Sequence, residues 1–327
     1  MRMRPFGNSG VRLSALGLGC MGMSGAYGPA DERASLRTID AALEAGINLL
    51  DTGDFYGHGH NELLIGRALK ERRDKVFLQV KFGALRAPNG AFIGFDARPA
   101  AVKSALAYTL VRLGTDYVDL YQPARVDPHV PIEDTVGAIG ELVSAGLVRH
   151  VGLSEASADT IRRAHREHPV TAVQMEYSLM SRGVEHEVLP VLRELGCALT
   201  AYGVLSRGLI GGKVGQHGND DIRHRMPRFS AENLGRNLKL VEALAAIATA
   251  RGLTPAQIAL AWVGARGDDV FPLIGTRTAA HLEEALAASD LVLETGELAR
   301  IERAVPAGAV AGERYPPSLM AELDSER

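Results

Sequence analysis

The chain has 327 residues, of which 46% are hydrophobic and 23% charged, and its formal net charge is -3. A net charge so close to zero argues against broad binding to nucleic acid or anionic membranes, which needs a basic surface. Two cysteines cannot build a disulfide framework, and no apolar run approaches the ~20 residues of a membrane span. We therefore expect a soluble, cytoplasmic protein with neither a nucleic acid nor a membrane as partner.

Short apolar, β-prone runs alternate along the chain with longer helical patterns. The runs lie near residues 16–20, 47–51, 76–81, 117–121, 148–153, 172–177, 198–203 and 270–274. The helical patterns lie at 31–45, 60–73, 97–113, 132–145, 156–167, 184–195, 231–250, 255–266 and 278–288. Repetition of strand and helix predicts βαβ units and a parallel sheet.

Eight such strands without a break in composition favour an α/β fold, a single (β/α)8 TIM barrel that forms one domain over residues 1–327. An open doubly wound sheet is the alternative. Before the first strand, Gly7-Asn8-Ser9-Gly10 predicts the turn of an N-terminal β-hairpin, which is placed to plug the barrel bottom. The segment after about residue 305 is rich in Pro and Gly, which predicts an irregular C-terminal tail.

Polar residues follow two neighbouring strands where functional residues of a barrel gather, at the carboxyl ends. Asp51 follows one apolar run and Lys81 closes the next, so the two side chains can pair. Tyr56 lies in the loop after Asp51. A nearby ammonium would lower the pKa of Tyr56 and make it a plausible proton donor to a reacting oxygen. A simple ion pair beside a bystander tyrosine remains the alternative.

The segments around these residues resemble the aldo-keto reductase family. Gly-Ile-Asn-Leu-Leu-Asp-Thr at 46–52, followed by Tyr56-Gly57 and Asn61-Glu62, is similar to the family signature. Further similar segments lie at 17–22, 151–155, 173–178, 201–209, 258–262 and 274–277. The resemblance implies a (β/α)8 barrel that reduces the carbonyl group of a small molecule with NADPH and uses no metal.

The resemblance implies a catalytic set that this chain carries only in part. The family's residues carry over to three positions, Asp51, Tyr56 and Lys81. The fourth family residue is a histidine, and Ala124 stands in its place. Either Tyr56 works alone, or a water fills the space, or another residue substitutes, the candidates being Gln122, His58 and His60. An Ala-Arg pair at this place also resembles the pyridoxal reductase branch, so pyridoxal and aromatic aldehydes are candidate substrates.

The resemblance also implies an NADPH site spread over several strand ends. The positions that match are Cys20, Met21, Asp51, Ser154, Gln174, Tyr202, Leu205, Arg207, Gly208, Lys213, Gly275, Thr276, Arg277, His281 and Glu284. Ser154 and Gln174 match residues that hold the carboxamide, and Tyr202 matches the aromatic residue that stacks on the nicotinamide ring. Arg277 favours NADPH over NADH, because a guanidinium binds the oxygens of a 2′-phosphate well.

Three further patterns in the sequence are weaker indications of function. Gly17 to Gly22 fits G-x-G-x-x-G, but the next helix begins only near Asp31, which disfavours a Rossmann site. His58-Gly59-His60 lacks further ligands at a recognised spacing, so no metal site is predicted. In the tail, Glu313-Arg314-Tyr315 resembles a recurrent stretch of related reductases that either caps the substrate pocket or packs the tail.

The replacement of the family histidine by Ala124 leaves a second function open. The alternative to a reductase is an NADPH-binding regulatory or sensing barrel with little turnover. The intact set of Asp51, Tyr56 and Lys81 argues against it, because a pure binding module would not need these three residues.

Overall fold

The computed structural model describes residues 1–211 and 221–326. Eight parallel strands close into a barrel, in the order β3-β4-β5-β8-β9-β10-β11-β12, with β12 pairing back to β3. The barrel strands are β3 (Gly17–Gly19), β4 (Leu49–Gly53), β5 (Phe77–Phe82), β8 (Val118–Pro123), β9 (Val148–Ser154), β10 (Val170–Glu176), β11 (Ala198–Tyr202) and β12 (Val270–Gly275). Every predicted strand is present, so the closed barrel is confirmed and the open doubly wound sheet is wrong.

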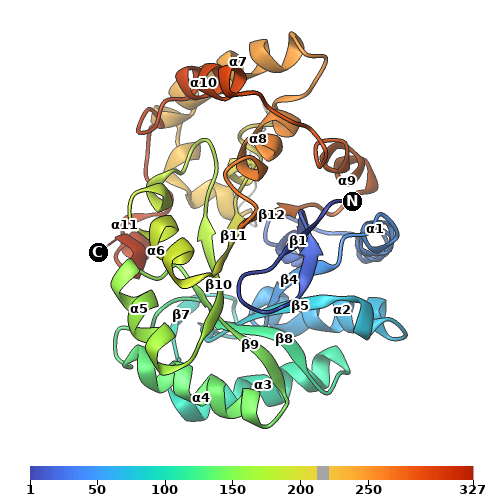
Figure 1. The fold of residues 1–327 in the computed structure, drawn as a ribbon, viewed down its shortest axis with the longest axis vertical. Coiled ribbons are helices and arrows are strands. Elements are labelled where there is room, and N and C mark those ends of the chain that lie inside the picture. The colour runs from blue at the N-terminus through green and yellow to red at the C-terminus, as the bar shows by residue number, and fades with distance from the viewer. Residues whose placement is uncertain (212–220, 327) are drawn as a thin grey trace.

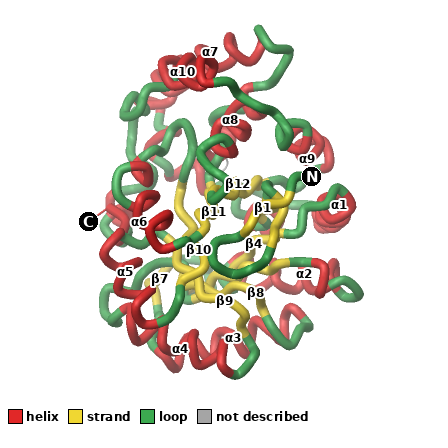
Figure 2. The backbone as a smooth tube through the Cα atoms, in the orientation of Figure 1, coloured by secondary structure: helices red, strands yellow, loops and turns green. Residues whose placement is uncertain are grey.

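Helices surround the barrel strands (Figures 1 and 2). They are α1 (Glu32–Glu44), α2 (His60–Leu69), α3 (Pro99–Leu113), α4 (Ile132–Ser144), α5 (Ala158–Glu167), α6 (Val188–Leu195), α7 (Ala231–Thr249), α8 (Pro255–Gly264), α9 (Ala279–Leu286), α10 (Thr295–Ala304) and α11 (Pro317–Met320). Side chains at several first turns set the boundaries. Asp31 accepts a hydrogen bond from the backbone of Ala34 before α1, and Thr254 forms a capping box with Gln257 before α8.

The N-terminal hairpin closes the amino end of the barrel, as expected. Strands β1 (Met3–Pro5) and β2 (Arg12–Ser14) pair antiparallel, and Phe6 between them is fully buried. The Phe6 ring lies 5.0 Å from the rings of Phe77 and of Phe271, at the amino ends of two barrel strands. A side chain at Gly7 would meet the Thr171 carbonyl oxygen at 2.4 Å, so only glycine permits this close approach.

Two other segments lie at the opposite, carboxyl end. A hairpin that the sequence analysis did not predict, β6 (Ala84–Arg86) with β7 (Phe92–Phe95), follows β5. The tail after α10 is mostly irregular, as predicted, apart from the single turn of α11 and the 3-10 turn Asp324–Glu326. Near its end, Asp324 accepts a hydrogen bond from the backbone of Ser157 at 2.8 Å, which ties the tail to the start of α5.

Across residues 1–211 and 221–326, the helices fall short of the length and hydropathy that a membrane crossing requires.

Candidate active site

An ion pair between Asp51 and Lys81 lies at the carboxyl ends of β4 and β5. The Lys81 Nζ donates to both carboxylate oxygens of Asp51, at 2.6 and 2.7 Å, and both side chains are buried. Asp51 also accepts from the amides of Gln174 at 2.7 Å and Gln79 at 3.1 Å. Burial lowers the pKa of Lys81, and the negative charge of Asp51 opposes that shift. The predicted pairing is therefore present, held by two amides besides the ammonium.

Tyr56 lies beside this pair. It begins the 3-10 turn Tyr56–Gly59, and the Lys81 Nζ is 5.2 Å from the centre of its ring. Burial, and then the negative charge of Asp51, raise the pKa of Tyr56 well above its usual value. The expected lowering of this pKa by Lys81 is thus wrong, because the ring is desolvated and Asp51 neutralises the ammonium. Tyr56 consequently keeps its proton at neutral pH.

Gln122 lies below Ala124, inside the barrel. It pairs in register with Lys81, and Tyr121, the preceding residue of β8, donates to the Val102 carbonyl of α3 outside the barrel. Gln122 is fully buried, and neither atom of its amide has a partner among the described residues. Of the three residues considered as substitutes for the missing histidine, it is the one placed next to Lys81.

The two histidines after Tyr56 have other partners. His60 shares a hydrogen bond with Ser24 at 2.9 Å and lies 3.3 Å from Glu32. His58 lies 3.4 Å from the Ala87 carbonyl oxygen, on the loop that joins β6 to β7. The described residues contain no group of three or more His, Cys, Asp or Glu side chains placed to hold a metal ion.

The residues expected around the nicotinamide come together at one side of the barrel mouth. Ser154 and Gln174 pair in register on β9 and β10, and the buried Ser154 hydroxyl has no partner in the described parts of the chain. Tyr202 ends the next strand and donates to Glu155 at 2.8 Å. Cys20 is fully buried, and burial raises the pKa of its thiol far above the usual value. Met21, half-buried, begins the 3-10 turn Met21–Ser24 that follows β3.

The residues expected around the phosphates and adenosine lie after β11 and β12. Leu205 precedes the 3-10 turn Ser206–Gly208, in which Arg207 has a left-handed backbone with φ of 56°. The Arg207 side chain is buried and pairs with Glu176 at 3.1 Å. Lys213 lies outside the described residues.

The loop after β12 leads into α9. Gly275 has open space around it, and the hydroxyl of Thr276 donates to a backbone carbonyl at 3.1 Å. Arg277 donates to the backbone carbonyls of Gly28 and Pro29 at 3.1 and 2.9 Å, and within the described chain it has no ion pair with a carboxylate. His281 and Glu284 lie on α9 and are at least partly exposed.

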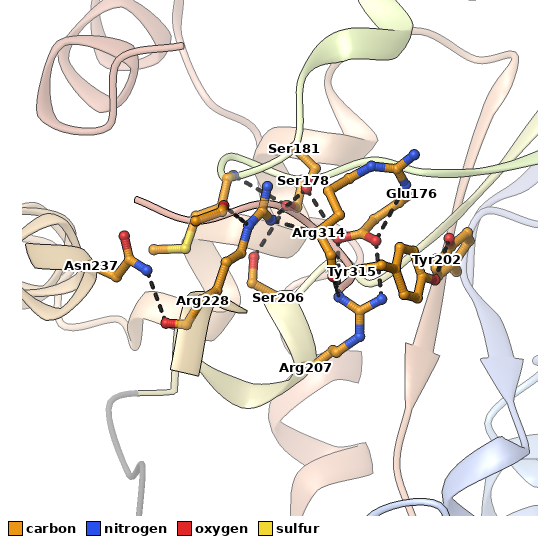
Figure 3. Close-up of polar contacts among 12 residues, drawn as sticks. Glu176, Ser178, Ser181, Tyr202, Ser206, Arg207, Arg228, Asn237, Arg314 and Tyr315 are labelled. Atoms are coloured by element: carbon orange, nitrogen blue, oxygen red, sulfur yellow. Dashed lines mark hydrogen bonds and ion pairs between the residues drawn. The ribbon is translucent and has the colours of Figure 1, made fainter. Parts of the chain in front are cut away.

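A buried ion-pair network that the sequence analysis missed borders this site (Figure 3). Glu176 accepts from Arg207 at 3.1 Å and from Arg314 at 3.4 Å, and Arg314 also donates to Glu155 at 2.8 Å. Burial raises the pKa of Glu155, but the charge and hydrogen bond of Arg314 outweigh burial and bring it down to about 2. Glu155 directly follows an apolar strand and Glu176 ends one, as Asp51 does in the sequence. This position at a strand end was the signal from which the two glutamates could have been predicted to lie at the site.

The tail contributes Tyr315 to the mouth of the barrel. Its hydroxyl lies 2.9 Å from the hydroxyl of Tyr202 and accepts a hydrogen bond from Arg125 at 3.2 Å. Arg125 directly follows Ala124, the residue that stands in the place of the family histidine. The tail therefore lies over the residue expected to face the nicotinamide, and its charged groups also pack it in place.

A closed parallel barrel with polar residues converging at its carboxyl end is the architecture of a barrel enzyme. The model of the Aldo/keto reductase family matches residues 15–306. The chain belongs to this family and is by class an oxidoreductase.

Relatives of known sequence or structure agree. Probable aldo-keto reductase 1 of Glycine max is 44% identical over 313 residues, covering 94% of this chain and 90% of that protein. The glycerol dehydrogenase AKR11B4 of Gluconobacter oxydans has a TM-score of 0.84 at 26% identity, covering 98% and 96% of the two chains. An aldo/keto reductase of Klebsiella pneumoniae in complex with NADP and acetate has a TM-score of 0.75 at 26% identity, covering 97% and 99%.

Proposed function

We propose that this protein reduces the carbonyl group of an aldehyde or ketone with NADPH, and that Tyr56 is the proton donor. The observation that carries the proposal is the convergence of Tyr56, Lys81 and Asp51 at one end of the barrel, with Lys81 2.6 Å from Asp51 and 5.2 Å from the Tyr56 ring. Membership of the family supports it, and so does the NADP complex of the Klebsiella pneumoniae relative.

The side chains present fit a nicotinamide cofactor. Ser154 has a buried hydroxyl without a partner among the described residues, next to the amide of Gln174, and these two groups match the needs of a carboxamide. Tyr202 offers an aromatic face for the ring. Arg277 is bonded only to backbone carbonyls within the described chain, so its guanidinium is suited to the 2′-phosphate that distinguishes NADPH. NADPH, when bound, supplies the hydride.

The chain's own residues handle the proton. Tyr56 is protonated at neutral pH and donates to the oxygen that becomes an alkoxide. Lys81 places a positive charge beside the resulting phenolate, and Asp51 holds Lys81 in position through two hydrogen bonds. Burial of all three side chains excludes water, which strengthens each of these interactions.

The test is Tyr56→Phe, assayed by NADPH oxidation with a panel of aldehydes that includes pyridoxal. Loss of the donor should lower kcat by roughly 10²- to 10⁴-fold, while NADPH binding, followed by fluorescence titration, stays near the parent value. Tyr108→Phe is the matched control, because Tyr108 is 63% exposed on α3. Parental turnover in Tyr56→Phe would contradict the donor role. A parent that binds NADPH tightly yet reduces none of the panel would favour the sensing barrel.

A further inference from the structure

Arg125 is a cation at the barrel mouth whose partners are all neutral. It directly follows Ala124, and its guanidinium donates to the Ala124 carbonyl at 2.6 Å and to the Tyr315 hydroxyl at 3.2 Å. Within residues 1–211 and 221–326, no carboxylate forms an ion pair with it. The charge of Glu155 acts on Arg125 and helps to keep its pKa raised in spite of burial, but Glu155 forms no ion pair with it, so the guanidinium can still bind an anion directly.

The other arginines of this region already have carboxylate partners. Arg207 pairs with Glu176 at 3.1 Å and Arg228 approaches it at 3.6 Å (Figure 3). Arg314 pairs with Glu155 at 2.8 Å.

Three arginines thus share two fully buried carboxylates, and Glu326, which pairs with Arg314 at 2.5 Å, is 40% exposed at the edge. Arg125 is therefore the arginine of this group that has no ion pair with a carboxylate among the described residues.

Arg125 also faces the side of the mouth where Tyr56 lies. The backbone of Ala124 bonds the Phe82 carbonyl at 2.8 Å, which places Arg125 beside the strand end that carries Lys81. The positive charge of Arg125 lowers the pKa of Tyr56, which burial raises. It also lowers the pKa of Lys81, in the same direction as burial does.

Resting on the proposed function, we propose that the substrate carries an oxyanion, a carboxylate or a phosphate, which Arg125 binds while the carbonyl oxygen faces Tyr56. A guanidinium fork matches either group with two parallel hydrogen bonds. Arg125 is in this view a specificity-determining residue. Binding the oxyanion would replace its bond to Tyr315, so substrate and tail compete for the same donor.

The experiment compares aldehydes matched in size. One pair is 4-formylbenzoate against 4-formylbenzamide, and the other is glyceraldehyde 3-phosphate against glyceraldehyde. The parent should prefer the anionic member of at least one pair by roughly ten- to a hundredfold in kcat/KM, the range of a charge-assisted hydrogen bond. The pair that shows the preference identifies the anion as carboxylate or phosphate.

The variants assign that preference to one side chain. In Arg125→Gln the ratio between the two members of the pair should fall close to one, mainly through KM, and Arg125→Lys should restore part of it. Arg166→Gln, at an exposed position on α5, is the control and should keep the parental ratio. A parent without preference, or an Arg125→Gln enzyme that keeps it, would overturn the inference while reduction of the neutral aldehydes upheld the proposed function.

If the parent reduces no aldehyde, the proposed function fails and binding decides the inference separately. With NADP+ present, 4-formylbenzoate or glyceraldehyde 3-phosphate should raise the melting temperature more than its neutral counterpart does. Arg125→Gln should abolish this difference. Equal shifts in the parent would overturn the inference. Should Arg125→Gln fail to fold, as its own melting curve would show, Arg125→Lys is compared instead and should reduce the difference without abolishing it.

Discussion

Asp54, two residues before Tyr56, is half-buried, and the enclosure of its carboxyl group destabilises the fold when that group is charged. One of its oxygens, Oδ1, has no hydrogen-bond partner among the described residues. Burial, followed by repulsion from Glu62, raises its pKa from 3.8 to about 7. The folded protein therefore binds this proton more tightly than the unfolded chain does. The contribution of Asp54 to the free energy of unfolding is therefore most favourable at low pH. It decreases as pH rises from about 4 to about 7 and is constant above that.

Replacing Asp54 with Asn should remove the free-energy cost of an enclosed negative charge while keeping the shape of the side chain. We expect Asp54→Asn to raise the free energy of unfolding by about 2–4 kcal/mol at pH 8. At pH 4 the gain should disappear, because the parent carboxyl is then protonated. Urea denaturation at the two pH values measures both. Asp116→Asn, at an exposed position, should change stability little at either pH. An equal gain at both pH values would show that ionisation of Asp54 is not the cause.

At the scale of elements, the C-terminal tail is held by charge. Arg314 contributes the cation that faces both Glu155 and Glu176, whose side chains are 0% exposed. The pKa of Glu155 is about 2, below its ordinary value of 4.5. The pair therefore stabilises the fold fully above pH 4.5, and this contribution is lost as pH falls toward 2.

Arg314→Met should leave buried carboxylates without enough positive charge. We expect a loss of about 3–5 kcal/mol in the free energy of unfolding at pH 7, and a smaller loss at pH 3, where protonation of Glu155 relieves the variant. Chemical denaturation at both pH values tests this. Arg303→Met, on the exposed face of α10, is the matched control. A loss that does not depend on pH would mean that packing of the tail, not charge, accounts for it.

The elements that sequence reasoning found are those with strong local patterns. The barrel strands are apolar runs that recur at a βα spacing, and α1 to α9 match predicted helices. Two missed elements carried usable local signals. Asn89-Gly90 is a typical hairpin turn between β6 and β7, and Glu294 with Glu297 forms a capping box before α10.

The site was predictable only where its residues belong to recognisable local segments. Asp51 and Lys81 end neighbouring strands, so their pairing follows from the barrel itself. The hydrogen-bonded ion pair between Glu155 and Arg314 joins residues 159 positions apart, and no local sequence pattern predicts a partner so far along the chain. The pKa of Tyr56 was predicted in the wrong direction because the sequence shows the cation but not the depth of burial.

At the scale of the whole molecule, the two ends of the barrel have separate tasks. The amino end is closed by Phe6, packed among residues such as Leu49, Phe77 and Leu120 at the strand starts. The proposed chemistry lies at the carboxyl end, around Lys81. Stability and activity should therefore respond to different substitutions.

Phe6→Ala should lower the free energy of unfolding by about 3–5 kcal/mol, since it empties a fully buried aromatic site. Below the melting temperature of the variant, kcat for aldehyde reduction should equal that of the parent. Denaturation and steady-state assays on the same preparation measure both. Tyr108→Ala, which removes a ring that is 63% exposed, is the control. A fall in kcat without a loss of stability would show that the hairpin influences the site directly.

Closure of the barrel joins the beginning of the chain to its end. Strand β3 pairs with β12, and Arg4 donates to the Val270 carbonyl across 266 positions of sequence. Such contacts give the fold a high contact order, which slows folding because a long loop must close before the contact forms. On the ribosome, β3 and the N-terminal hairpin are made first but wait for their last partners until most of the chain has emerged. Until β12 has been made, the edge of β3 that pairs with it stays free, and a free strand edge is prone to mispairing.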